Sequence, residues 1–220
     1  MNQKFRAFPK RLEVVAFDCD GVLFDSKEAN IAFYTHILET VGLPPVRPDQ
    51  HEYIHMHPVH ESLRFLVPNE VHFQSAWTYC QSIDFRAFNA RLHCEPGLLK
   101  VLEVAKSSYR TALATNRTVS TRDVLIYHKI DHYFDLVVSA SDVPMPKPHP
   151  DAMLKIFETF TVSPEEVIYI GDSAVDAAFA SACGVYFIAY KNPSLKAHMH
   201  ISHFDELHPL LLAGRASRVG

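Results

Sequence analysis

The chain has 220 residues, 48% of them hydrophobic and 21% charged, which is typical of a soluble globular protein with a substantial core. A formal net charge of −4 offers no basic field for a nucleic-acid backbone, and no stretch approaches the roughly 18 apolar residues of a membrane span. The N-terminal segment lacks a signal-peptide pattern, and the four scattered cysteines predict neither a disulfide framework nor a zinc site. We therefore expect a cytoplasmic protein whose partner is a small molecule, with no nucleic-acid or membrane partner.

The first predicted element is a buried strand at residues 12–17, LEVVAF, which runs directly into D-C-D-G-V-L-F-D-S at residues 18–26. About 85 residues then precede the next apolar run, at residues 111–115, although a parallel crossover needs only a dozen or more. Helical patterns at residues 28–40, 60–66 and 70 to about 92 fill this interval. We therefore expect an inserted α-helical cap domain at residues 26–94, and a core domain at residues 1–25 and 95–220.

The apolar run at residues 111–115 predicts the second strand. Three further apolar runs predict strands at residues 136–140, 167–170 and 185–190. Helical patterns at residues 98–107, 119–129, 151–160 and 173–182 alternate with these strands. Strands that alternate with helices indicate an α/β fold, with a Rossmann-like parallel sheet that helices cover on both faces. The segment at residues 195–212 is expected to close the core as a final helix or loop.

Polar side chains follow four of the five predicted strands, at the point where each strand ends or in the loop just beyond it. The carboxyl ends of the strands in an open α/β sheet are where ligands bind, so these side chains are expected to converge. In chain order they are Asp18 and Asp20, then Thr115 and Asn116, then Lys147, then Asp172 and Asp176.

Each of these motifs taken alone has a purely structural explanation. The D-x-D-G motif is common in turns, Thr115-Asn116 can cap a helix, and Lys147 between two prolines can be a solvated loop residue. Asp172 and Asp176, at the start of a helix, can complement the helix dipole. Four such motifs in this order, each after its own strand, argue for a functional site instead.

The chemistry of these residues favours phosphoryl transfer. Carboxylates packed together cannot all stay ionised without a cation, and oxygen ligands without a nearby Cys/His set favour Mg²⁺. With Lys147 and the metal offsetting negative charge, a phosphate dianion can approach Asp18, whose carboxylate would attack phosphorus. Asp20 would protonate the leaving oxygen, while Thr115 and Asn116 would bind phosphoryl oxygens.

These motifs resemble those of the haloacid dehalogenase-like (HAD) hydrolases, in the branch similar to phosphoglycolate phosphatase and β-phosphoglucomutase with a helical cap. The match covers essentially residues 12–190: D-C-D-G-V-L-F-D-S is the first motif, Thr115 the second, Lys147 the third and G-D-S-A-V-D the fourth. The resemblance implies that Asp18 is the nucleophile and Asp20 the acid/base. It also implies that Asp18, the Asp20 backbone carbonyl and Asp172 ligate Mg²⁺, with Asp176 behind them or as an alternative ligand.

The resemblance favours a phosphatase that acts on a small phosphomonoester, phosphoglycolate-like or a sugar phosphate. Dehalogenases of the superfamily lack the second aspartate, and phosphonate hydrolysis would require a cap lysine, whereas no lysine lies between Lys27 and Lys100. A sugar-phosphate mutase with the same core residues, and a catalytically silent protein that binds a phosphorylated metabolite, are the alternatives. We expect a monomer, with a dimer as the alternative.

The cap matches the family only in position and helical character. Arg64, near the start of a cap helix, is the first candidate for substrate binding because its fork of donors suits a carboxylate or a second phosphate. A group of histidines lies nearby in the sequence, and a second metal site, substrate contact and plain surface polarity are all open for it. The group consists of His51, His55, His57 and His60.

Overall fold

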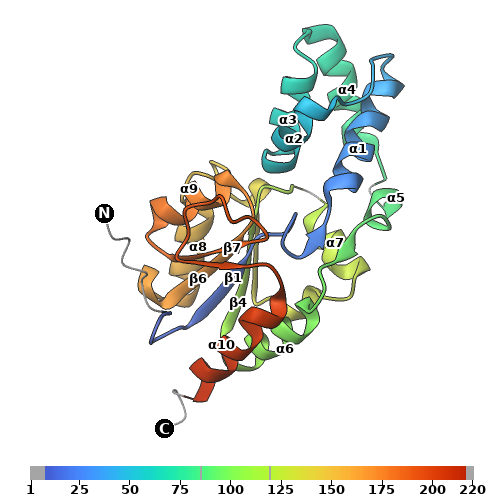
Figure 1. Cartoon of the computed structure of the whole chain (residues 1–220). Coiled ribbons are helices and arrows are strands. Elements are labelled where there is room, and N and C mark those ends of the chain that lie inside the picture. Colours follow the sequence, from blue (N-terminus) through green and yellow to red (C-terminus); the bar gives the residue numbers. More distant parts are fainter. Residues whose placement is uncertain (1–7, 85, 119, 217–220) are drawn as a thin grey trace.

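A six-stranded sheet forms the centre of the molecule in a computed structural model that describes residues 8–84, 86–118 and 120–216 (Figure 1). The strand order is β5-β4-β1-β6-β7-β8, and every neighbouring pair is parallel. The strands are β1 (Val14–Phe17), β4 (Arg110–Thr115), β5 (Leu136–Ser139), β6 (Val167–Gly171), β7 (Tyr186–Tyr190) and β8 (Met199–Ile201). The α/β fold with a Rossmann-like parallel sheet, expected from the sequence, is confirmed.

The five predicted strands form within two residues of their expected bounds, because each is a continuous apolar run long enough to be buried on both faces. The sixth strand, β8, was not predicted from the sequence. Its three residues, Met-His-Ile, carry too little pattern to indicate a strand, and the structure forms it by pairing with β7. Helix α10 (Phe204–Ala216) follows, so the expected final helix or loop is a short strand and a helix.

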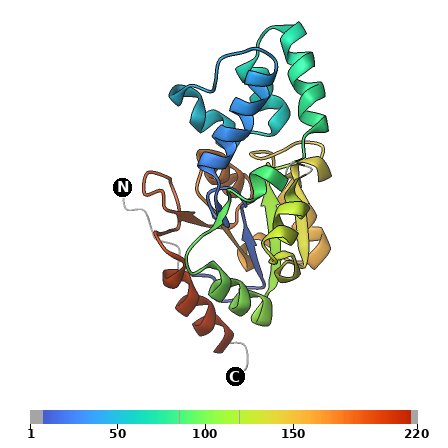
Figure 2. The ribbon, with the colours of Figure 1, turned by 90° about the vertical axis from the view of Figure 1, so that its right-hand side faces the viewer.

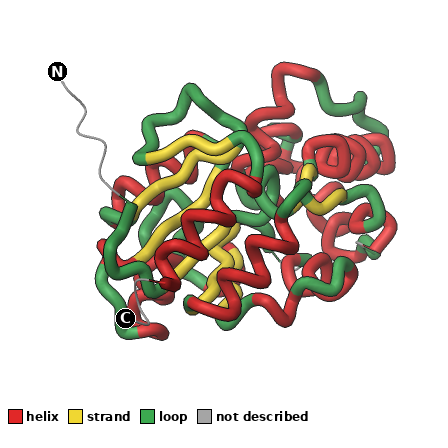
Figure 3. The backbone as a smooth tube through the Cα atoms, turned by 60° about the horizontal axis from the view of Figure 1, so that its bottom comes forward, coloured by secondary structure: helices red, strands yellow, loops and turns green. Residues whose placement is uncertain are grey.

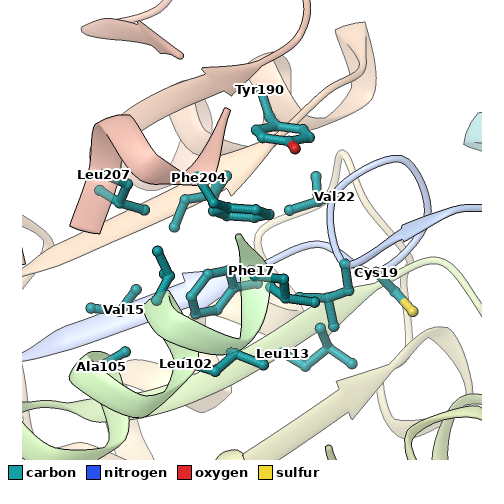
Figure 4. Close-up of a cluster of buried hydrophobic side chains, with 14 of the residues drawn as sticks. Val15, Phe17, Cys19, Val22, Leu102, Ala105, Leu113, Tyr190, Phe204 and Leu207 are labelled. Carbon is teal, nitrogen blue, oxygen red and sulfur yellow. The ribbon is translucent and has the colours of Figure 1, made fainter. Parts of the chain in front are cut away.

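Helices cover both faces of the sheet, and alternate strand residues point to opposite sides. One face packs against α6 (Leu98–Ser108), α7 (Thr121–Tyr127) and α10, and the close-up in Figure 4 shows Val15 and Phe17 of β1 there with Leu102 and Phe204. The other face packs against α8 (Asp151–Phe160) and α9 (Ala174–Cys183). Figure 3 shows the strands between these helical layers. The predicted start of α7 at Val119 lies outside the described residues.

Helices inserted between β1 and β4 form a separate lobe, beside one end of the sheet (Figures 1 and 2). They are α1 (Lys27–Thr40), α2 (His51–Met56), α3 (Val59–Leu66), α4 (Glu70–Ser82) and α5 (Arg86–Asn89), with a 3-10 turn at Pro48–Gln50 before α2. Side chains of α1 to α4 share a hydrophobic cluster of their own, centred on Ile37, Leu63 and Phe73. We refer to these helices as the cap.

The sequence prediction of one helix from residue 70 to about 92 is wrong. Helix α4 ends at Ser82 because the backbone of Ile83 is extended, with φ −70° and ψ 136°. That conformation packs Ile83 against the cap cluster, and the chain then forms the short α5. Helix α2 was not predicted from the sequence, because its six residues, HEYIHM, have no clear apolar period.

Two strands of two residues each join the cap to the core. Strand β2 (Phe24–Asp25) pairs antiparallel with β3 (His93–Cys94), so the two connections lie side by side. Just after β3, the buried Glu95 accepts hydrogen bonds from Tyr190 Oη at 2.9 Å and Lys191 Nζ at 2.6 Å, which ties the second connection to the end of β7.

None of the helices among the described residues is long and apolar enough to cross a membrane.

Candidate active site

The predicted core residues meet at the carboxyl end of the sheet because β1 lies between β4 and β6. Asp18 follows β1, Thr115 ends β4, and Asp172 follows β6. A cavity of about 810 Å³, including its open mouth, lies between this edge and the cap. All but one of the core residues predicted from the sequence line it: Asp18, Asp20, Thr115, Asn116, Lys147 and Asp172. Asp176 lies fully buried behind them.

Lys147 is the centre of the charged network. Its Nζ lies 2.8 Å from Asp18 Oδ1 and donates hydrogen bonds to Asp176 Oδ1 at 2.7 Å and Tyr169 Oη at 2.8 Å. Burial alone would lower the pKa of Lys147, but the charges of Asp176 and Asp18 outweigh it and raise that pKa above its usual value. Lys147 is therefore a fixed cation beside the predicted nucleophile.

Asp176 holds this cation in place. Its Oδ1 accepts from Lys147 Nζ and from Tyr169 Oη at 2.7 Å, while its Oδ2 accepts from the Ser173 backbone N–H at 3.1 Å and the Ser173 hydroxyl at 2.5 Å. Burial, the largest single cause, raises the pKa of Asp176, but the charge of Lys147 and the hydrogen bonds from Lys147, Ser173 and Tyr169 together outweigh it, so the pKa is lowered overall. Since both oxygens are already hydrogen-bonded, Asp176 fits the role of anchor for Lys147 better than that of a direct metal ligand.

The environments of Asp18 and Asp172 disfavour the ionised form of both carboxyl groups. Burial, together with the nearby charge of Asp176, raises the pKa of Asp18 to about 7 although Lys147 lowers it. Burial also raises the pKa of Asp172, whose Oδ1 is buried with no hydrogen-bond partner among the described residues. Oxygens of Asp18, Asp172 and Asp176 lie within 4.8 Å of one another. An orphaned buried oxygen and a carboxyl that resists ionisation are what a missing hard cation would correct, so the residues fit Mg²⁺.

Asp20 lies two residues beyond Asp18 at the same cavity. Its Oδ2 is 3.5 Å from Nε of Arg117, while its Oδ1 is buried without a hydrogen-bond partner. Arg117 follows Thr115 and Asn116 and also lines the cavity. One Asp20 oxygen is therefore oriented by a cation, and the other is not engaged by any described residue.

The turn after β1 depends on Gly21. Its φ of +78° is a left-handed conformation that side chains disfavour. A Cβ at this position would also collide with the carboxylate of Asp172. Glycine therefore allows the β1 turn and the β6 loop to approach closely enough for Asp18 and Asp172 to share one site.

Two consecutive residues at the end of α2 make polar contacts with the core edge. Nε2 of His55 lies 3.6 Å from Asp172 Oδ2, and its Nδ1 accepts from the Asn30 amide at 3.2 Å. The backbone carbonyl of Met56 accepts a hydrogen bond from Asn116 Nδ2 at 3.0 Å. Nδ2 of Asn116 also donates to the Lys147 carbonyl, and its Oδ1 accepts from the Lys147 N–H, both at 2.9 Å. Asn116 therefore positions Lys147 and contacts the cap, with its amide already hydrogen-bonded.

Arg64 lies away from the cavity, contrary to the sequence prediction. Its Nη1 donates to Glu70 Oε2 at 2.6 Å, and its guanidinium stacks 3.5 Å from the ring centre of Phe73. Arg64 occurs near the end of α3, not its start, so its side chain reaches α4 instead of the core. The position of α2 and α3 relative to the sheet is a tertiary property that the local sequence pattern did not contain.

The cap histidines separate into different environments. His55 and His57 line the cavity, whereas His60 packs edge-on against Phe73 and Trp77. Among the described residues, the only group of three or more candidate ligands is the aspartate cluster, so the second metal site considered from the sequence has no geometric support.

Three residues with roles at the site were not singled out as site residues from the sequence. Tyr169 lies within a predicted buried strand, and its only signal is a polar tip in an otherwise apolar run. Arg117 is adjacent to Thr115-Asn116, where a cation beside a phosphate-binding motif is a usable signal. His55 was one of four histidines, and only its place on α2 distinguishes it.

The sequence profile of the haloacid dehalogenase-like hydrolases matches residues 15–190. The chain belongs to this family. This HAD chain is 26% identical over 191 residues to the pyrophosphatase PpaX of Bacillus mycoides, covering 81% of this chain and 83% of the relative. It is 29% identical over 180 residues to a phosphorylated carbohydrates phosphatase of Thermotoga maritima, covering 79% and 82%.

Solved structures agree with the family assignment. A subfamily IA HAD-superfamily hydrolase from Geobacter sulfurreducens is 37% identical, with a TM-score of 0.75, and covers 91% of this chain and 97% of its own. The family expected from the sequence motifs is thus confirmed, and the chain is a HAD hydrolase whose curated relatives include phosphatases.

Proposed function

We propose that this HAD hydrolase is a Mg²⁺-dependent phosphatase that hydrolyses a small phosphomonoester through an aspartyl-phosphate on Asp18. The observation that carries the proposal is the position of Asp18 on the cavity wall, with Lys147 Nζ 2.8 Å from its Oδ1 and Asp20 nearby on the same turn. The relatives named as phosphatases support the reaction class.

In the first step, a carboxylate oxygen of Asp18 attacks phosphorus and the bond from phosphorus to the leaving oxygen breaks. Asp20 donates its proton to that leaving oxygen, so the product departs as a neutral alcohol. In the second step, Asp20 removes a proton from water, which attacks phosphorus and releases inorganic phosphate and the Asp18 carboxylate.

The surrounding residues hold the reacting groups. Lys147 offsets the negative charge of the incoming phosphate, and Asp176 and Tyr169 keep Lys147 in place. The Thr115 hydroxyl, on the cavity wall, is available to a phosphoryl oxygen. Mg²⁺ would be held by Asp18, Asp172 and the Asp20 backbone carbonyl, and when bound it supplies charge stabilisation to the phosphoryl oxygens.

The test is phosphate release from p-nitrophenyl phosphate by the purified protein, with Mg²⁺ and with excess EDTA. We expect turnover only with Mg²⁺, because otherwise the aspartate cluster repels the dianion. Asp18→Asn is expected to reduce turnover below detection, since an amide is not a competent nucleophile, while Asp25→Asn, at an exposed carboxylate of β2, serves as the matched control. Full activity in EDTA would contradict the metal proposal, and activity in Asp18→Asn would place the nucleophile elsewhere.

The remaining expectations from the sequence belong to this proposal. Residues 26–94 would act as the cap domain and the rest as the core domain, in a monomeric cytoplasmic protein. The sugar-phosphate mutase differs in its product, because it returns an isomeric phosphate ester without net phosphate release. A silent binding protein would retain ligand affinity without turnover. Phosphate release therefore separates the phosphatase from both alternatives, and formation of an isomeric phosphate ester separates the mutase from the binding protein.

A further inference from the structure

Asn89 is one of the residues that line the cavity, and its side-chain Nδ2 is buried with no hydrogen-bond partner among the described residues. Asn89 ends α5 and is 2% exposed, and its backbone carbonyl accepts a hydrogen bond from His128 Nε2 at 3.3 Å. A buried amide nitrogen that stays unpaired costs about 1–3 kcal/mol, and buried polar groups in proteins nearly always find a partner. The unpaired nitrogen therefore indicates a ligand atom at this position.

The surroundings of Asn89 indicate what kind of ligand atom it is. Phe33 and Phe88 line the same cavity and pack edge to face, with ring centres 5.3 Å apart. Among the described cap residues on the cavity wall there is no Lys, Arg, Asp or Glu; the two imidazoles there are His55, directed at Asp172, and His57, whose Nδ1 is bonded to the Tyr53 carbonyl.

The cations on the core side of the cavity are already engaged. Lys147 is held between Asp18 and Asp176, and Arg117 faces Asp20. A second negative charge on the substrate, placed at the cap end, would lose water against aromatic rings without gaining a free cation from the residues that the structure describes. A hydroxyl or carbonyl oxygen would instead accept the unused N–H of Asn89.

We propose that Asn89 donates a hydrogen bond to an oxygen of the leaving group, and that the cap end of the cavity selects an uncharged leaving group over one bearing a carboxylate or second phosphate. This inference rests on the proposed phosphatase function and narrows its substrate class to monoesters of neutral, oxygen-rich alcohols. A substrate without an acceptor oxygen leaves the buried amide unpaired. A substrate with a carboxylate or second phosphate can pair with the amide but loses its hydration with no free cation among the described residues to offset the charge.

The first experiment compares glycerol 3-phosphate with 3-phosphoglycerate, which share a three-carbon skeleton and differ by a hydroxymethyl group in place of a carboxylate. With Mg²⁺ present, we expect kcat/KM for glycerol 3-phosphate to be higher by about tenfold or more. An equal or higher value for 3-phosphoglycerate overturns the inference. Absence of any turnover, even of p-nitrophenyl phosphate, would instead refute the proposed function, so the two failures are distinguishable.

The second experiment tests the role of Asn89 itself. Asn89→Leu keeps the approximate volume and the backbone bond to His128 but removes the donor, so the ratio of kcat/KM for glycerol 3-phosphate to that for p-nitrophenyl phosphate is expected to fall about tenfold. Asn89→Ser, which retains a smaller donor, is expected to lose less. Arg91→Leu, an exposed neighbour outside the cavity, is the matched control and is expected to leave the ratio unchanged. An unchanged ratio in both Asn89 variants overturns the assignment, and thermal unfolding checks that each variant is folded.

Discussion

The surroundings of Asp18 oppose its ionisation. Burial and Asp176 raise its pKa from 3.8 to about 7 despite the adjacent Lys147. The folded chain therefore binds this proton more tightly than the unfolded chain does. Stability that comes from the protonated carboxyl is present below pH 4 and is lost as the pH rises towards 7. Without a cation beside it, the ionised carboxylate of Asp18 therefore lowers the stability of the folded chain above about neutral pH.

Asp18→Asn is expected to stabilise the metal-free protein at pH 8, because the amide has no charge to bury. We expect a gain of at least about 1 kcal/mol, or roughly 2–4 °C in melting temperature for a chain of this size, and a smaller gain at pH 5. Thermal unfolding in EDTA at both pH values measures it, with Asp25→Asn as the exposed control. Equal melting temperatures for Asp18→Asn and the parent chain at pH 8 would contradict the charge balance inferred from the structure.

Asp20 is expected to act on the leaving group, because it is the second carboxyl at the cavity and one of its oxygens is unengaged. Nitrophenolate is stable enough to leave without a proton, whereas the leaving oxygen of an alkyl phosphate must be protonated as the bond to phosphorus breaks. Asp20→Asn should therefore slow the phosphorylation step with glycerol 3-phosphate by about a hundredfold, within the usual range for general acid catalysis, and slow it less with p-nitrophenyl phosphate. Single-turnover bursts measure this step, and equal losses with both substrates would argue against an acid role.

At the scale of elements, the turn after β1 and the loop after β6 are brought together by one glycine. Gly21 and Gly42 have nearly the same φ, +78° and +76°, but a Cβ at Gly42 meets nothing within 4 Å whereas one at Gly21 collides with Asp172. A comparison of the two glycines therefore separates the strain of a left-handed residue from the displacement of Asp172, a proposed metal ligand.

Gly21→Ala is expected to weaken Mg²⁺ activation, with at least a tenfold higher Mg²⁺ concentration for half-maximal activity. Gly42→Ala should show only the backbone penalty of about 1–2 kcal/mol in stability, with unchanged Mg²⁺ activation. Mg²⁺ titrations of p-nitrophenyl phosphate hydrolysis, together with thermal unfolding, measure both effects. A similar Mg²⁺ response in the two variants would show that contact with Asp172 is not what Gly21 provides.

The elements differ in how far sequence alone predicts them. Strands β1, β4, β5, β6 and β7 are continuous apolar runs, and burial on both faces makes such runs visible in the sequence. Strand β8 and helix α2 are too short to show a clear apolar pattern, and the structure forms them through contacts with β7 and with the other cap helices. The interruption between α4 and α5 has the same origin, because packing of Ile83 against the cap overrides a continuous helical pattern.

At the scale of the whole molecule, the core side of the site was predictable and the cap side was not. Asp18, Thr115 and Asp172 each follow a strand, so the topology of a parallel sheet is sufficient to bring them together. Cap residues reach the cavity only through the way the cap sits against the carboxyl end of the sheet. That arrangement depends on contacts between residues far apart in the sequence. This is why the sequence favoured Arg64, whereas the structure places His55 of α2 over the aspartates.

We therefore expect opposite phenotypes when His55 and Arg64, two basic residues of the cap, are replaced. His55 is 18% exposed and lies 3.6 Å from a carboxylate oxygen of Asp172, so His55→Ala removes a polar group from the cavity wall. We expect it to lower kcat/KM for both glycerol 3-phosphate and p-nitrophenyl phosphate by about tenfold, with a small change in melting temperature. Arg64 is 41% exposed and contacts Glu70 and the ring of Phe73 within the cap.

Arg64→Ala should instead leave both kcat/KM values within about twofold and lower stability by about 0.5–1 kcal/mol, the usual worth of an exposed cation–π contact. Steady-state kinetics with both substrates and thermal unfolding measure these effects. His55→Ala is expected to lower kcat/KM with little loss of stability, and Arg64→Ala to lower stability with little loss of kcat/KM. If Arg64→Ala reduces kcat/KM for glycerol 3-phosphate by tenfold while p-nitrophenyl phosphate is spared, Arg64 reaches the substrate during turnover. In that case, the cap must rearrange enough to break the contact between Arg64 and Glu70 whenever substrate binds.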